Sequence, residues 1–275
     1  MARKDAACRL PLWMTVLCVS FSCSTAMAES VLQVLPTRIV MEGPKRADTI
    51  TLINRGDSDG TYRIFFRNLR ASEEGRLAEV TEAIAGERFA DRMVRFSPRR
   101  ITVPARSKQS VRVLVRKPAD IEAGEYRSHM VFRKMPGDSA SSESDQLDDS
   151  NIGFSLKPIV EVTIPVIVRH GDVSATVSLS DASFKQEDDG TYLAVTLNRE
   201  GTRSLYGDFD VWQLAPDGQR NKLGYAKGIA VYTPNKVRSF ALPIDGELSQ
   251  GQVIVEFRED VNYGGSEAAR VELEI

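Results

Sequence analysis

Alternation of apolar and polar residues with a period of two recurs along most of this chain. In the first half it covers Thr49–Asn54, Thr61–Arg67, Ser110–Arg116 and Tyr126–Arg133. In the second half it covers Ala175–Leu179, Tyr192–Asn198, Asp208–Leu214, Val237–Pro243, Gln252–Arg258 and Ala269–Ile275. Successive side chains of a strand point to opposite faces, so this pattern is typical of half-buried strands. Many short strands without a long amphipathic helix predict an all-β protein built as a sandwich or barrel.

The first 28 residues have the pattern of a secretory signal peptide. Arg3, Lys4 and Arg9 form a positive start, an apolar stretch follows over Leu10–Phe21, and Ala26-Met27-Ala28 is a small-residue cleavage pattern. The apolar stretch is shorter than the roughly 20 residues that a helix needs to span a bilayer. We therefore expect cleavage after Ala28 and export of the remaining chain.

Charged and reactive residues argue against several classes of function. Lys and Arg number 36 against 38 Asp and Glu, and this formal charge of −2 gives no footprint for nucleic acid. The three cysteines, Cys8, Cys18 and Cys23, lie in the leader, and Phe21 disfavours Cys23 as a lipoprotein site. Motifs for a nucleophile or a phosphate loop are missing, and His129 is expected to pack within a strand rather than act as a base. We therefore expect no enzyme, no metal and no cofactor.

Two segments interrupt the strand pattern and divide the chain. Residues 136–153 are rich in Ser, Asp and Gly, which predicts a disordered surface loop. Its aspartates Asp145, Asp148 and Asp149 lack the spacing of a calcium-binding loop. Arg169–Asp172 separates a long strand from a new series of strands. We expect a signal peptide at 1–28, a first domain at 29–169 and a second domain at 170–275, each the size of one sandwich.

The segment Phe154–Arg169 alternates over an unusual length, since every even position from Phe154 to Val168 is apolar. About 15 residues at ~3.3 Å each run about 50 Å, whereas a typical strand has about 5–6 residues. Pro158 and Pro165 cannot donate to a ladder, which indicates a sheet edge. Two alternatives remain open. The segment is an edge strand kept for addition to another protein, or a central strand shared by two packed domains.

Three stretches follow one another in the first half of the chain: Val34–Gly43 with a Thr-Arg pair, Phe96–Val113 and Gly124–Pro136. Together they resemble the PapD-like periplasmic pilus chaperones. The first resembles the family's first strand, the second the signature before its sixth strand, and the third the next strand. A variable loop and the long alternating strand follow in the family's order. The resemblance is good over 31–169 and weak over 171–275. The segment Tyr126–His129 differs from the best-known members, which indicates a divergent branch. It implies two immunoglobulin-like β-sandwich domains in a boomerang arrangement.

The same resemblance implies donor-strand complementation, in which the chaperone lends its long strand to a pilus subunit that lacks its last strand. The donor-strand side chains are then Phe154, Leu156, Pro158, Val160, Val162 and Ile164. The family anchors the subunit's terminal carboxylate with an Arg on the first strand, which Arg38 matches, and a Lys on the long strand, where this chain has Pro165. Arg127 is assigned to the anchor with Arg38, and Lys157 and Arg169 are alternatives for the second cation.

The implied partners are pilus or fimbrial subunits and an outer-membrane usher that receives them, and the implied location is the periplasm. The unliganded protein is a candidate self-dimer, because its apolar strand is exposed. The rival hypothesis is a secreted immunoglobulin-like adhesive or structural protein that binds its ligand with loops at one end of a sandwich. The strand Phe154–Val168 discriminates between them, since only the chaperone needs it to be available.

Overall fold

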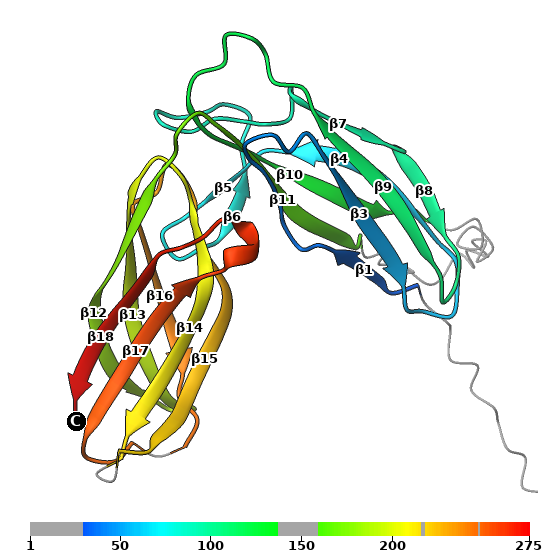
Figure 1. The fold of residues 1–275 in the computed structure, drawn as a ribbon. Helices are drawn as coiled ribbons and strands as arrows, with labels where there is room; N and C mark the ends of the chain where they lie inside the picture. The colour runs from blue at the N-terminus through cyan, green and yellow to red at the C-terminus, as the bar shows by residue number, and fades with distance from the viewer. Residues whose placement is uncertain (1–29, 137–158, 216–217, 247) are drawn as a thin grey trace, which may run out of the picture.

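The computed structural model describes residues 30–136, 159–215, 218–246 and 248–275. The expected signal peptide and nearly all of the expected 136–153 loop lie outside these residues. Over the described part the chain forms strands and one short 3-10 turn, η2 (Val261–Tyr263), which confirms the all-β class. The strands build two immunoglobulin-like β-sandwiches that meet at an angle (Figure 1). None of the described helical segments is long and apolar enough to cross a membrane.

The first sandwich consists of two facing sheets. The four-stranded sheet has the order β1-β3-β9-β7, with bounds Leu32–Leu35 (β1), Ala47–Asn54 (β3), Lys108–Val115 (β9) and Val94–Ser97 (β7). The five-stranded sheet has the order β2-β11-β10-β4-β8, with bounds Ile39–Met41 (β2), Glu161–His170 (β11), Gly124–Lys134 (β10), Gly60–Arg67 (β4) and Arg100–Val103 (β8). Alternate residues of each strand enter a common core. In β3, for example, Ile50 and Leu52 are buried while Thr49 is exposed.

The second sandwich also consists of two sheets. The three-stranded sheet has the order β12-β13-β16, with bounds Ala175–Glu187 (β12), Gly190–Gly201 (β13) and Val237–Pro243 (β16). The four-stranded sheet has the order β15-β14-β17-β18, with bounds Arg220–Val231 (β15), Leu205–Leu214 (β14), Gln252–Glu259 (β17) and Ala268–Glu274 (β18). Its core has an aromatic centre, in which the Phe209 ring lies 4.7 Å from that of Phe240 and 5.0 Å from that of Phe257, centroid to centroid.

The start of the chain crosses from one sheet of the first sandwich to the other. β1 forms the edge of the four-stranded sheet, whereas β2 runs parallel to β11 and pairs with Val166–Val168 only. Within the described residues, Glu161–Pro165 is therefore paired on one side, by β10, and open on the other. The prediction of an edge strand therefore holds over Glu161–Pro165. It is wrong over Val166–Val168, because β2 covers the strand there.

A two-stranded hairpin of the first half of the chain extends to the second sandwich. It consists of β5 and β6, Leu69–Ala71 and Leu77–Glu79. At its tip the main-chain N–H of Ser239, in β16, donates to the carbonyl of Glu73 over 2.9 Å. The Asn235 amide donates to the carbonyl of Ala71 over 2.8 Å. The hairpin thus joins the two sandwiches at the margin of the second one, as Figure 1 shows.

Truncation of Phe209 to Ala should destabilise the second sandwich by about 3–5 kcal/mol, because it leaves a cavity among three packed rings. Urea unfolding followed by tryptophan fluorescence measures this loss, since Trp212 lies in the same strand. The control is Tyr225→Ala on the exposed face, which should change stability by less than about 0.5 kcal/mol. Equal effects of the two substitutions would contradict this account of the core.

Candidate functional site

Two arginines that are far apart in the sequence meet where the two sandwiches join. Arg38 directly precedes β2, and Arg127 lies on the face of β10 that points away from the first core. Both are buried, with exposed fractions of 3% and 5%. The sequence assigned these two residues to one anchor, and the structure brings them to one place through a shared neighbour, Tyr232.

Tyrosines of the second sandwich cover both guanidinium groups. The Arg38 Nη2 donates to the Tyr232 hydroxyl over 2.7 Å. The Arg38 guanidinium carbon lies 3.8 Å from the centroid of the Tyr206 ring, and that of Arg127 lies 4.1 Å from the centroid of the Tyr232 ring. Aromatic faces attract cations, but they do not replace the hydrogen bonds that a buried guanidinium loses with water.

Several donors of this pair have no partner. Among the described residues, Arg38 Nε and the Nε and Nη1 atoms of Arg127 are buried without a hydrogen bond. Neither arginine forms a salt bridge with a described carboxylate, and Arg127 Nη2 has only a long contact of 3.5 Å with the carbonyl of Thr233. Burial lowers the pKa of Arg127, and Arg38 adds to this effect, against Tyr232 and Glu125, which raise it. Two buried cations with free donors form a place suited to an anion.

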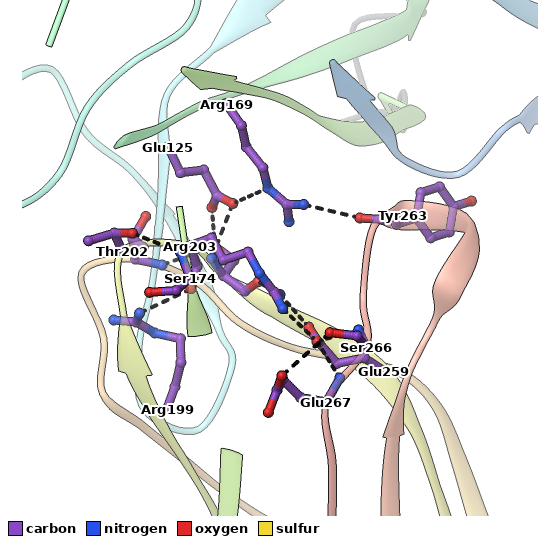
Figure 2. A network of polar contacts seen from close by, with 12 residues as sticks. Glu125, Arg169, Ser174, Arg199, Thr202, Arg203, Glu259, Tyr263, Ser266 and Glu267 are labelled. Atoms are coloured by element: carbon purple, nitrogen blue, oxygen red, sulfur yellow. Dashed lines mark hydrogen bonds and ion pairs between the residues drawn. The ribbon is translucent and has the colours of Figure 1, made fainter. Parts of the chain in front are cut away.

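Arg169, the alternative second cation, is already paired. Its Nε lies 3.1 Å from Oε2 of the buried Glu125, and its Nη1 lies 3.0 Å from Oε2 of Glu42. Nη1 also donates to the carbonyl of Tyr263 in the second sandwich over 3.3 Å, as Figure 2 shows. This arginine therefore braces the two sandwiches. The third alternative, Lys157, lies outside the described residues.

Glu125 is the centre of this brace. Its carboxylate accepts from the main-chain N–H of Ser204 over 3.1 Å and from the Ser204 hydroxyl, in addition to Arg169. The same hydroxyl accepts from the N–H of Thr233 over 3.1 Å, next to Tyr232 in the chain. The brace therefore places Tyr232 against the two arginines.

A second ion pair supports the same end of the second sandwich. Arg203 donates to both carboxylate oxygens of Glu259, over 2.7 and 2.9 Å, and this bidentate contact is buried (Figure 2). Burial raises the pKa of Glu259, but the bonds from Arg203 and from the N–H groups of Ser266 and Glu267 outweigh it and leave the pKa below its usual range. The pair fixes the loop before β14, which carries Ser204.

The expected donor-strand residues differ in their surroundings. Phe154, Leu156 and Pro158 lie outside the described residues. Val160 is 47% exposed, and Val162 is half-buried and packs against the first core. Ile164 is only 3% exposed and belongs to that core, so the folded sandwich does not offer it to a partner. Sequence periodicity placed all six on one face, but it does not show where the sandwich ends along that face.

A groove continues the first core at this end of the sandwich. It has a volume of about 280 Å³ and is lined by Ser30, Val31, Leu32, Tyr62, Phe132, Lys134, Val160 and Val162. Val31 and Val160 are exposed apolar residues in this lining. The even positions therefore pass from buried core at Ile164, in β11, to an open apolar groove at Val160, which directly precedes β11.

No family model and no curated protein matches this chain. Solved structures with a similar fold include a chaperone and tip adhesion subunit complex, CsuC–CsuE, from archaic Csu pili of Acinetobacter baumannii, with a TM-score of 0.45 and 12% identity over 88% of this chain and 97% of that chain. Another is the CupB2 chaperone of Pseudomonas aeruginosa, with a TM-score of 0.44 and 12% identity over 89% and 100%. A third is the SafB chaperone with the SafA pilin of Salmonella enterica, with a TM-score of 0.40 and 10% identity over 89% and 96%. The first and third of these structures are complexes of a chaperone with a subunit, and the second is a chaperone alone.

Replacement of Glu125 by Ala should destabilise the protein by about 3–5 kcal/mol, because it leaves the buried Arg169 without its main counter-charge. Chemical denaturation of the full chain measures the change. The matched control is Glu272→Ala, which removes the exposed ion pair with Arg270 and should change stability by at most about 1 kcal/mol. A Glu125→Ala variant as stable as this control would show that the brace is dispensable.

Proposed function

We propose that this chain is a periplasmic chaperone that captures pilus or fimbrial subunits by donor-strand complementation and delivers them to an outer-membrane usher. One observation supports the proposal. The open edge of β11 ends beside two buried arginines that form no salt bridge with a described carboxylate. In this proposal, residues 1–28 are a signal peptide, residues 29–169 are the chaperone domain and residues 170–275 are a second domain. The chain acts by binding its client and catalyses no reaction.

The open edge has a defined end. β2 is parallel to β11 and begins at Ile39, opposite Val166, so Arg38 lies where the covered part of β11 starts. A client strand that pairs with the open part of β11 would meet Arg38 at that point. For its terminal carboxylate to reach Arg38, the client strand must run in the same direction as β11, as β2 does. From Val166 to Val160 the distance is about 20 Å at ~3.3 Å per residue, which is the length available for this pairing.

The apolar groove gives the second contribution. An incomplete sandwich exposes its own core where a strand is missing, and Val160 and Val162 would enter that core from the face that already continues the core of this chain. Full burial of one such side chain contributes about 1.5–3 kcal/mol. Main-chain pairing gives affinity and the alternate side chains give selectivity, as in other complexes formed by strand addition.

The two arginines give the third contribution. A carboxylate that accepts from Arg38 and Arg127 would occupy the donors that have no partner in the free protein. Hydrogen bonds to charged groups are worth about 1.5–3 kcal/mol each. The carboxylate marks the end of a chain, so this contact would also fix the register of the client strand on β11.

Introduction of a charge at Val160 tests the donor strand. Val160→Asp should leave stability within about 0.5 kcal/mol, because the side chain is half exposed, but reduce client capture at least about 100-fold, because the carboxylate would be buried unpaired in the client. The readout is recovery of a one-to-one complex after co-expression with small secreted β proteins encoded beside its gene. Ile164→Asp is the contrasting control and should unfold the first sandwich. Normal capture by Val160→Asp would reject strand lending and favour an adhesive or structural protein.

Replacement of Arg38 by Met, which keeps most of the side-chain volume, tests the anchor. Capture of the same client should weaken roughly 10- to 150-fold, the equivalent of about 1.5–3 kcal/mol for one charge-assisted contact. Thermal stability should stay equal or rise, because the substitution removes a buried cation that lacks a carboxylate partner. Unchanged affinity in a folded Arg38→Met variant would remove Arg38 from the binding site.

A further inference from the structure

His129 lies beside the two arginines and, like several of their N–H groups, has no hydrogen-bond partner among the described residues. It follows Arg127 by two residues in β10 and therefore points to the same face of the sheet. It is 1% exposed, and neither Nδ1 nor Nε2 has a hydrogen-bond partner among the described residues. Its ring lies 6.3 Å from the ring of Tyr232 in an edge-to-face arrangement. A neutral imidazole offers one donor and one acceptor, and burying both without partners is unfavourable.

The charged and titratable groups around His129 come from several elements. They are Arg127 of β10, Arg38 before β2, Arg67 of β4, opposite His129 in the ladder, and Tyr232 after β15. β11 contributes Pro165, which has no charge. Arg67 is bound to Glu79 and Glu161 and is therefore neutralised. Arg127 and Arg38 form no salt bridge with a described carboxylate, although Glu125 and Glu87 act on Arg127 from a distance, and the His129 ring has no hydrogen-bond partner among the described residues.

We propose that His129 is the third donor of the anion site formed by Arg38 and Arg127, and that a carboxylate enters this site together with a proton that His129 takes up. This inference rests on the proposed function of the two arginines and adds a regulation to it. In the free protein the imidazole stays neutral, because a third cation would repel the other two. A bound carboxylate reverses this balance, so the imidazole becomes protonated and donates to the anion.

Acidity should therefore strengthen binding. Burial, together with Arg127 and Arg38, lowers the pKa of His129 to about 3 in the free protein, so the ring is neutral between pH 5 and 7. An opposite charge within hydrogen-bonding reach favours the charged imidazole, so a bound carboxylate raises the pKa of His129 from this low value. Proton uptake on binding then increases the affinity as the pH falls from 7 to 5, by up to about tenfold.

The chain has two histidines, so a His170→Gln background leaves His129 as the single imidazole. His170 lies at the end of β11, opposite Gly124. The experiment records NMR spectra of histidine-labelled full chain between pH 7 and 4, without and with a short peptide of alternating valine and threonine that ends in a free carboxylate. The same peptide with an amide end is the matched control. We expect the imidazole to stay neutral alone and with the amide, and to protonate with a midpoint above pH 4 with the carboxylate.

Two results distinguish this inference from the function on which it rests. If the carboxylate peptide binds more tightly than the amide, in a manner lost in Arg38→Met, but the His129 signals do not titrate, the anchor stands and the role of His129 is rejected. If neither peptide distinguishes wild type from Arg38→Met, the anion site itself is rejected, and with it this inference. A His129→Gln variant adds a second readout, because it should bind the carboxylate peptide with an affinity that no longer changes between pH 7 and 5.

Discussion

The arrangement of the two sandwiches depends on the hydrogen bonds that the buried Glu125 carboxylate accepts. It belongs to the first sandwich, yet it accepts hydrogen bonds from Ser204 of the second. Ser204 in turn holds Thr233, and the next residue back in the chain, Tyr232, covers Arg38 and Arg127. A single desolvated charge therefore links the joint between the sandwiches to the geometry of the candidate binding site.

The site is built from groups that the isolated protein does not satisfy. Arg169 and Arg203 pair with carboxylates, and the equally buried Arg199 donates to main-chain carbonyls, so these structural guanidinium groups have hydrogen-bond acceptors. Arg38 and Arg127 are buried to a similar extent and have aromatic rings instead. Natural proteins commonly give up stability where a function needs an incomplete interaction. The contrast within one protein is the reason to regard the second pair as a binding site and the first as a brace.

Part of this organisation is predictable from the sequence. Period-two alternation identified the strands and the all-β class, because the side-chain pattern of a strand is local. The roles of Arg127 and Arg169 could not be separated in this way, since each depends on which residue of another strand stands opposite. The same holds for β11, whose covered half is defined by β2, more than 120 residues earlier in the chain. The sequence predicts only that His129 packs within a strand. Its lack of hydrogen-bond partners depends on three separate segments of the chain, which no local pattern shows.

The hairpin β5–β6 has a mechanical consequence. The sandwiches are joined by the chain at His170, by the brace around Glu125 and, separately, by the contacts of Ala71 and Glu73 with Asn235 and Ser239. Attachment at several separate places resists bending of one sandwich about any single pivot. Any lifting of Tyr232 from the arginines would then have to strain the hairpin as well as the brace.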